Sequence, residues 1–440
     1  MWKALGLSFV LSQGLVACQE SEELVDNQTQ TEPIPPQPIA KIPTKESNEA
    51  TQKTELSEDI GRWRRARPAQ DAFEQLEALG YMEGYEQAPG FAGIMRHQKE
   101  KTFKGYNFYV SGHGTAAILL DMDGKTLHEW SYPFQMAFPD EPPIDRKDNT
   151  QEYWRRGYLY PNGDIIVLHT NYGTMRLDKD SKPKWIVKNK PHHHLTVTED
   201  GNIYVLTRRL NVVPEINPKK KVWEGGIDIL SDDGTVLRNV SILKALLTSD
   251  LKEPKEALGT AGDLLHTNSI EVLDGRLSTL IPAFKKGNVL LSFRKLNMIA
   301  VLDMDTEKLV WAKTGVWVKQ HDAFVVDEDS LILFNNNTGS KKSSVMIINP
   351  KTDEEQWTFV GSKEEPFYTS SCGANQWLPN GNVLMVESNF GRALEVTKEG
   401  EIVWEFVSPH RAGEKKELIA TLFDVDRLPE SFDISWAKNR

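Results

Sequence analysis

The feature that most constrains the fold is a repeated pair of strands. Each of six segments has an apolar strand, a turn with an acidic residue or Gly, and a second strand, which carries a Trp in five of the six. The segments are Ala117–Trp130, Met175–Trp185, Ile227–Val240, Ile299–Trp311, Val345–Trp357 and Ala393–Trp404. Self-similarity at a regular spacing indicates a repeat architecture.

A second pattern lies between these segments and completes each repeat. It is a polar turn followed by an apolar run, and it occurs at residues 161–168, 199–206, 286–291, 327–334 and 379–386. Asn-Gly and Asp-Gly next to β-branched runs are hairpin signals, so each unit should contain four strands. The units average about 51 residues between Gly105 and Pro409, which suits propeller blades.

The repeats therefore predict an all-β chain with a six-bladed β-propeller over residues 105–410 and short flanking helices. Two separate β-sandwiches are the alternative, and the even repetition disfavours them. Residues 58–104 are expected to form a helical lead-in, with a helix over Ala69–Leu79. Residues 411–440 are expected to form a C-terminal extension, with a helix over Lys415–Phe423.

The N-terminus indicates export. Residues 1–18 combine a basic start, a short apolar stretch and the sequence Leu15-Val16-Ala17-Cys18, which is similar to the bacterial lipoprotein box. We expect lipidation of Cys18 and anchoring at the periplasmic face of the outer membrane, with a plain secretory signal as the alternative. Residues 19–57 are polar and lack aromatic residues, which favours a disordered tether.

Composition narrows the function classes. The formal net charge of −11 argues against a nucleic-acid partner. Two cysteines exclude a disulfide framework and a four-cysteine zinc site. With Cys18 lipidated, Cys372 is expected to be a free, buried thiol. The composition leaves the oligomeric state open.

Comparing the repeats position by position places polar residues at one end of the predicted channel. The start of one strand and the end of its antiparallel partner lie at the same rim. The strand starts contribute His193, His266, Asn268 and His321, and the strand ends contribute Thr170, Arg208, Arg294 and Asn336. For Arg208, which is followed by a lysine-rich loop, a solvated face is an equally good interpretation.

Imidazole and guanidinium groups from different blades, with no carboxylate in register, suit a small oxyanion such as sulfate or phosphate. The run His192-His193-His194 could instead bind a metal. Strand alternation should point His193 away from His192 and His194, which disfavours a metal site. By the same rule Asp322 should point away from His321. We expect no metal and no cofactor.

At these residues the chain resembles the bacterial arylsulfate sulfotransferase family. Four motifs carry the resemblance: His192-His193 before Asp-Gly-Asn, His266-Thr-Asn268-Ser, Ser292-Phe-Arg294, and Gln320-His321. The chain departs from the family pattern at His194, where the family has Asp, and in Phe334-Asn335-Asn336, where it has Phe-Asp-Asn.

The resemblance implies an exported six-bladed propeller that moves a sulfuryl group from an aryl sulfate to a phenol. His321 would be the nucleophile and form a sulfohistidine. Arg294, Asn268, His266 and His193 would donate hydrogen bonds to the sulfuryl oxygens. His192, Arg208, Asn336 and Thr170 would line the substrate site.

Two other classes remain open from the sequence. A non-catalytic propeller lipoprotein that binds or scaffolds envelope proteins would need only blade surfaces. A quinone-dependent dehydrogenase propeller is faintly suggested by the Asp-Gly-Lys element that ends at Trp130. Only the sulfotransferase requires His321 together with Arg294.

Overall fold

The computed structural model describes residues 84, 86–142, 149–337, 340–413 and 415–437. The expected export signal with Cys18, the tether and the helix over Ala69–Leu79 lie outside these residues, so the lipid anchor and its location stay predictions. No helix in the described part of the chain is long and apolar enough to cross a membrane.

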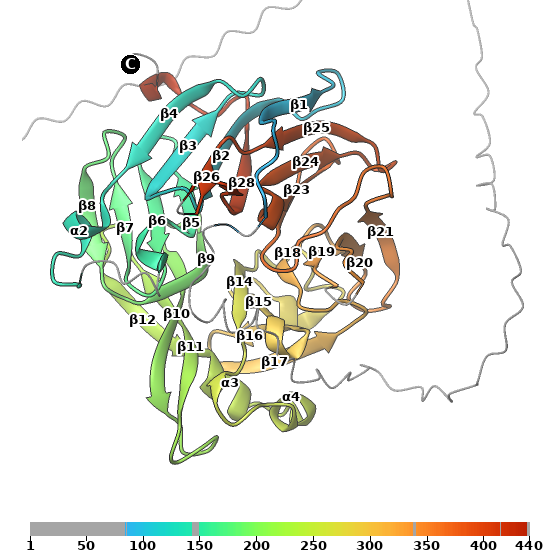
Figure 1. Cartoon of the computed structure of the whole chain (residues 1–440). Helices are drawn as coiled ribbons and strands as arrows, with labels where there is room; N and C mark the ends of the chain where they lie inside the picture. Colours follow the sequence, from blue (N-terminus) through green and yellow to red (C-terminus); the bar gives the residue numbers. More distant parts are fainter. Residues whose placement is uncertain (1–83, 85, 143–148, 338–339, 414, 438–440) are drawn as a thin grey trace, which may run out of the picture. The chain divides into compact units, whose positions relative to one another are not determined.

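Six antiparallel sheets surround a central axis, which confirms the six-bladed β-propeller (Figure 1). From the axis outward, blade 1 consists of β28 (Leu422–Pro429), β2 (Gly105–Ser111), β3 (Ala116–Leu120) and β4 (Thr126–Ser131). Blade 2 consists of β5 (Arg156–Leu159), β6 (Ile165–His169), β7 (Gly173–Leu177) and β8 (Pro183–Val187). Blade 3 consists of β9 (Pro191–Val197), β10 (Ile203–Val212), β11 (Lys221–Leu230) and β12 (Val236–Ser241).

Blades 4 to 6 follow in chain order. They consist of β14 (Thr267–Val272), β15 (Val289–Phe293), β16 (Met298–Asp303) and β17 (Lys308–Thr314); β18 (His321–Val325), β19 (Leu331–Asn335), β20 (Ser344–Ile348) and β21 (Glu355–Val360); and β22 (Ala374–Trp377), β23 (Val383–Glu387), β24 (Arg392–Val396), β25 (Ile402–Val407) and the added edge strand β1 (Gly93–His97). The six predicted strand pairs are the third and fourth strands of the six blades, counted from the axis.

The C-terminal segment closes the ring, which corrects the predicted extension. Strand β28 pairs with β2 from Gly105↔Pro429 to Ser111↔Leu422, so it is the inner strand of blade 1. The helix predicted over Lys415–Phe423 is wrong: β27 (Leu418–Ile419) pairs with β26 (Arg411–Ala412), and β28 follows. Apolar and polar residues alternate from Phe423 to Asp426, which is a strand period.

The N-terminal lead-in is also partly a strand. Within residues 58–104, β1 pairs with β25 and extends blade 6. Both ends of the described chain are thus tied into neighbouring blades. A propeller needs such closure because an unpaired inner strand would leave backbone groups without hydrogen bonds.

A buried ion pair links the closing strand to blade 6. The Arg427 guanidinium lies 2.7 Å from the Glu395 carboxylate, and both side chains are fully buried. Arg427 also donates to Asn107 Oδ1 at 2.7 Å and lies over the Trp404 ring. Multiple hydrogen bonds offset the cost of removing these charges from water.

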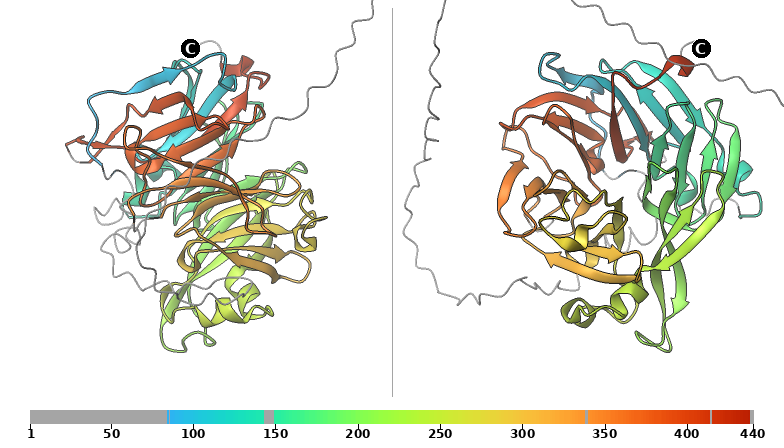
Figure 2. Two further views of the ribbon diagram at one scale, coloured as in Figure 1. Left: turned by 90° about the vertical axis from the view of Figure 1, so that its right-hand side faces the viewer. Right: turned by 180° about the vertical axis from the view of Figure 1, so that it is seen from behind.

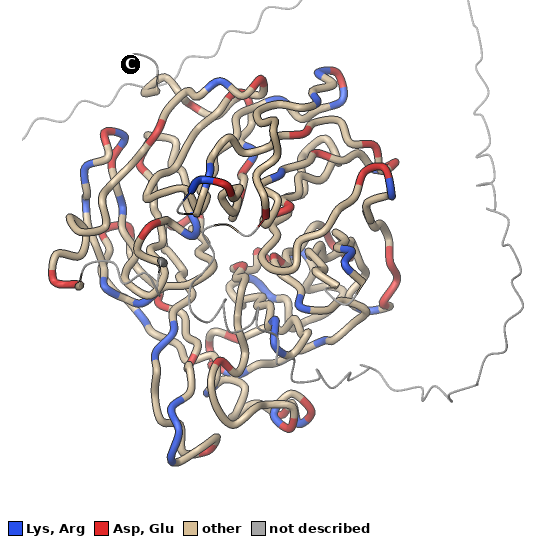
Figure 3. The backbone as a smooth tube through the Cα atoms, viewed as in Figure 1, with Lys and Arg blue, Asp and Glu red and all other residues tan. Residues whose placement is uncertain are grey.

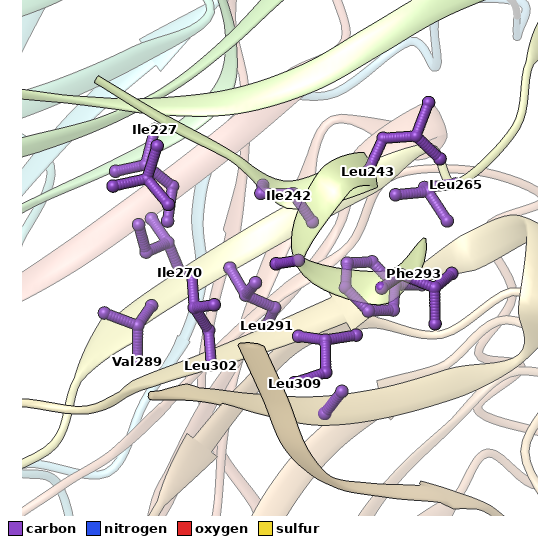
Figure 4. Close-up of a cluster of buried hydrophobic side chains, with 14 of the residues drawn as sticks. Ile227, Ile242, Leu243, Leu265, Ile270, Val289, Leu291, Phe293, Leu302 and Leu309 are labelled. Atoms are coloured by element: carbon purple, nitrogen blue, oxygen red, sulfur yellow. The ribbon is translucent and has the colours of Figure 1, made fainter. Parts of the chain in front are cut away.

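Apolar clusters between neighbouring sheets hold the blades together. The largest side chains of one such cluster, including Ile227, Leu291 and Phe293, pack between blades 3 and 4 (Figure 4). Helix α3 (Ile242–Leu247) places Ile242 and Leu246 against the same cluster. Figure 2 shows α3 and α4 (Lys252–Glu256) outside the ring, beside the projecting β10–β11 hairpin.

We predict that Arg427→Ala lowers the free energy of unfolding by about 3–5 kcal/mol, because it leaves the buried Glu395 carboxylate without its partner. The matched control is Arg238→Ala, whose half-exposed pair with Glu307 should contribute less than about 1 kcal/mol. Urea unfolding measures both. Equal losses in the two variants would contradict the role assigned to Arg427.

Candidate active site

Strand pairing places the strand starts and strand ends that carry predicted site residues at one rim. His321 pairs with Phe334, Thr267 with Phe293 and Pro191 with Thr207, so each strand start lies beside the end of its neighbour. Four of the side chains at this rim are almost completely removed from water: His192, Asn268, Arg294 and His321 are each at most 4% exposed. We call this end of the channel the mouth.

The three-histidine run does not follow strand alternation. His193 has a φ of 55°, in the left-handed region, and the pairing of β9 with β10 is irregular between Val205 and Thr207. As a result the Nδ1 atoms of His192 and His193 are 2.8 Å apart. The prediction that these two rings face opposite sides is therefore wrong.

Hydrogen bonds fix the proton positions in this pair. His192 Nε2 lies 3.2 Å from the Thr207 carbonyl oxygen, so it must donate and leave a lone pair on Nδ1. His193 Nδ1 then donates to His192 Nδ1. Burial, then the charge of Arg208, lowers the pKa of His192 to about 3, which agrees with a neutral ring.

His266 joins this group and brings a carboxylate that the repeat comparison missed. Its ring lies 4.8 Å from that of His193, centroid to centroid, and its Nδ1 is 2.9 Å from Asp263 Oδ2. Asp263 lies in the short strand β13 (Gly262–Asp263), which pairs with β11 outside the four-strand pattern. In the sequence, only its position three residues before His266 could have indicated that Asp263 pairs with this histidine.

Asp263 is held in its charged form. Burial alone would raise its pKa, but His266 and then Arg208 hold the pKa below its usual range. The ionised carboxylate accepts the Nδ1–H of His266 and orients the ring. Asp263 lies outside the repeat register, so the comparison of equivalent positions did not include it.

His321 has a single consistent protonation pattern. Its Nδ1 lies 2.7 Å from Asn336 Oδ1 and 3.0 Å from the Lys319 carbonyl oxygen. Asn336 Nδ2 donates to the carbonyl oxygens of Thr369 and Cys372, so its oxygen is the atom that faces His321. Because both neighbours are acceptors, Nδ1 carries the proton and Nε2 carries the free lone pair.

Burial and nearby cations keep His321 neutral. Burial is the main cause that lowers its pKa well below the usual value, followed by the charge of Arg294. The hydrogen bond that His321 donates to Asn336 raises the pKa but does not reverse the shift. A neutral imidazole with a free Nε2 is the form required of a nucleophile.

The remaining predicted residues divide into near and peripheral ones. Arg294 is buried, and its backbone N–H donates to the His266 carbonyl oxygen at 3.1 Å. Asn268 Nδ2 donates to the Gln320 carbonyl oxygen at 2.8 Å, so it positions the residue before His321. Arg208 donates to Asn171 and lies over Trp223, as a mainly buried side chain rather than a solvated one.

Thr170 does not join the histidines. It follows β6 at the mouth, and its hydroxyl has no hydrogen-bond partner among the described residues. Asn336 has no amide proton left for a substrate, because Nδ2 makes two bonds to carbonyl oxygens. It orients His321 instead of binding a ligand directly.

Sequence reasoning also missed Arg155. This residue precedes β5 and is 7% exposed, and its charge contributes to the lowered pKa values of both His193 and His321. Its Nη2 lies 3.6 Å from the sulfur of Cys372, whose thiol is buried as predicted. Arg155 lies in the connection between blades 1 and 2, which is not part of the repeat, so a comparison of equivalent repeat positions could not identify it.

His194 and Asp322, which follow His193 and His321 in the sequence, lie along the channel below the mouth. His194 Nε2 lies 3.6 Å from Asp322 Oδ1, and the Asp322 Oδ2 atom accepts from the Asn375 N–H at 2.7 Å. Asp322 thus faces away from His321, as expected. No group of three or more His, Cys, Asp or Glu side chains within the described residues is arranged to hold a metal ion.

The mouth thus combines guanidinium groups, several imidazoles and one neutral histidine whose Nε2 lone pair is free. The model of the family described as "Arylsulfotransferase (ASST)" matches residues 158–409, more than half of the chain. The chain belongs to the arylsulfotransferase family. Membership implies arylsulfotransferase-like function on small aryl sulfates and phenols. Among curated proteins, none matches this chain.

Solved structures similar to this arylsulfotransferase family member are distant. A protein of unknown function from Bacteroides caccae is 11% identical, with a TM-score of 0.46 over 73% of this chain and 98% of that one. A streptogramin B lyase is 14% identical, with a TM-score of 0.41 over 78% and 96%. The virginiamycin B lyase of Staphylococcus aureus is 13% identical, with a TM-score of 0.39 over 76% and 99%.

We predict that His321 stays in the neutral Nδ1–H form between pH 5 and 8. Its pKa lies well below the usual value for histidine, so the ring should not gain a proton in this pH range. Nitrogen-15 spectra of histidine side chains measure this, with His321→Gln to assign the signal. A titration with its midpoint between pH 6 and 7 would contradict the assignment.

Proposed function

We propose that this protein transfers a sulfuryl group between phenols through a covalent adduct on His321 Nε2. The observation that carries the proposal is the pair of acceptors at His321 Nδ1, which leaves the Nε2 lone pair free. Family membership supports the reaction class, and the buried cations support an anionic substrate.

In the first step, the Nε2 lone pair of His321 forms a bond to the sulfur of an aryl sulfate. The bond between that sulfur and the aryl oxygen breaks, and the phenolate leaves. Protonated His266, stabilised by Asp263, gives its proton to the leaving oxygen. Arg294 and Arg155 stabilise the charge on the three sulfuryl oxygens.

In the second step, the phenol acceptor reverses this sequence. Its oxygen attacks the sulfur, the nitrogen–sulfur bond of His321 breaks, and the phenol proton passes to the now neutral His266. The enzyme returns to its starting protonation state without any other reactant. An aryl sulfate carries its own leaving group, so no nucleotide donor is required.

The structure favours His266 over His193 as the proton carrier. His193 uses its Nδ1–H in the hydrogen bond to His192, and burial, then the charge of His266, lowers its pKa well below the usual value. Neutral His193 therefore presents a lone pair on Nε2 and lacks the donor that the sequence comparison assigned to it. Its ring packs against His266 and positions it.

We predict that the purified protein releases nitrophenolate from p-nitrophenyl sulfate when phenol is present, and that His321→Ala abolishes the release because no nucleophile remains. A sulfate group on a His321 peptide, detected by intact-mass and peptide mass spectrometry, should appear when phenol is omitted. The control is His97→Ala, which alters an ion pair at the outer edge of blade 6.

The same assay separates the enzyme from a binding propeller. Release that is equal in the wild type and His321→Ala would overturn the nucleophile assignment. Absence of release from a panel of aryl sulfates would favour the scaffold alternative.

We further predict that Arg155→Met lowers kcat/KM by about 10²-fold, because one charged donor to the sulfuryl oxygens is lost. Arg209→Met, on the half-exposed surface of the β10–β11 hairpin, is the control and should leave kcat/KM unchanged. An unchanged kcat/KM in correctly folded Arg155→Met would exclude Arg155 from the substrate site.

A further inference from the structure

A second chamber lies along the same inner strands, further from the mouth. It has a volume of about 250 Å³. Five of the six blades contribute to its wall, including the charged or polar side chains of Arg156, His194 and Asp426 and the aromatic rings of Phe108, Tyr158 and Phe324. Figure 3 shows acidic positions near the centre of the ring as well as at its periphery.

Three carboxylates lie in or near this chamber: Asp424, Asp322 and Asp426. The first two have hydrogen-bond or ion-pair partners. Arg156 Nη1 lies 2.8 Å from Asp424 Oδ2 and 3.9 Å from Asp322 Oδ1. Asp322 also accepts two contacts from blade 6 through Asn375, one at Oδ2 and one at its carbonyl oxygen, both 2.7 Å. The charge of the Arg156 guanidinium acts on Asp424 first, then on Asp426 and Asp322.

The third carboxylate, Asp426, has no hydrogen bond or ion pair with any described side chain. It faces the chamber. Burial, then the charge of Asp424, raises its pKa to about 8, and burial raises the pKa of Asp322 to about 7. Asp426 is partly buried, and its raised pKa keeps it mainly neutral at neutral pH. A bound cation would favour its ionised form.

His194 gives an independent indication of a ligand. It is 4% exposed, it lines the chamber, and neither of its ring nitrogens has a hydrogen bond in the described part of the chain. Its Nε2 is 3.6 Å from Asp322 Oδ1, beyond hydrogen-bond distance. A neutral imidazole next to carboxylates offers an acceptor to an N–H donor from a ligand.

The chemistry of the wall selects the class of cation. Calcium takes six or more oxygen ligands, but Arg156 already occupies the space between two of the three carboxylates and would repel a divalent ion. An organic ammonium needs one carboxylate and one further acceptor. The aromatic rings beside Asp426 suit its apolar part and contribute cation–π attraction.

We propose that this chamber binds a small organic ammonium ion, with its N–H groups at Asp426 and His194 and its apolar part against Phe324 and Tyr158. The site is separate from sulfuryl transfer, because Arg156 and His194, which line the chamber, directly follow Arg155 and His193 and face the other direction. Amine binding therefore does not require the proposed function.

The test is calorimetric titration of the full chain with 2-phenylethylamine. We expect saturable binding at one site, with 2-phenylethanol and phenylacetate at least tenfold weaker because they lack the positive charge. His321→Ala should bind the amine with unchanged affinity, which separates this site from the nucleophile. Saturable binding of calcium chloride without amine binding, or tighter binding of phenylacetate, would overturn the proposal.

Variants locate the ligand within the chamber. Asp426→Asn should weaken amine binding at least tenfold, while the control Glu430→Gln, at an exposed position just after β28, should not change it. His194→Leu provides a second variant that keeps the test decisive if Asp426→Asn does not fold. Unchanged affinity in either folded chamber variant would show that the amine binds elsewhere and would overturn the proposal.

Discussion

The pairing of β28 with β2 is the interaction on which the rest of the structure depends. It brings the two ends of the repeat into one sheet, so six inner strands surround the axis instead of five. The fully buried Arg427–Glu395 pair connects this closing strand to blade 6. Without the closure, Arg156 would lose its Asp424 partner, and the strand starts would have no fixed positions around a common channel.

Consecutive residues on the inner strands serve different parts of the channel. Arg155, His193 and His321 contribute to the cationic mouth, whereas Arg156 and His194 line the chamber below it, near Asp322. His193 and Asp322 both have left-handed backbone, with φ values of 55° and 53°. Such conformations cost about 1–3 kcal/mol each and persist where surrounding contacts require them. Here they re-aim polar side chains at the start of a strand.

The repeat made most of the propeller predictable, because strand alternation and hairpin turns recur with local signals in each blade. His321, Arg294 and Asn336 could be placed at one rim by counting from a turn. Counting failed where the local geometry departs from a regular strand. The left-handed backbone at His193 turned its ring toward His192, which no residue pattern indicated.

Site residues that lie outside the repeat could not be predicted from the sequence either. Asp263 and Arg155 come from connections between blades, so a comparison of equivalent positions could not include them. The closing strand was misread because Leu422–Pro429 has no hairpin partner nearby in the sequence, and its partner is more than 300 residues away. Long-range pairing of this kind has no local signal.

In the proposed mechanism, the mouth must bind an anion and also keep a nucleophile reactive. Guanidinium groups would stabilise the sulfuryl oxygens, and the Asp263 carboxylate orients His266. If that carboxylate faced His321, it would favour a protonated ring with no free lone pair. Instead His321 Nδ1 meets two neutral acceptors, Asn336 and the Lys319 carbonyl group, while burial and then the charge of Arg294 lower its pKa. Burial and the charges that would bind the substrate therefore both keep His321 neutral.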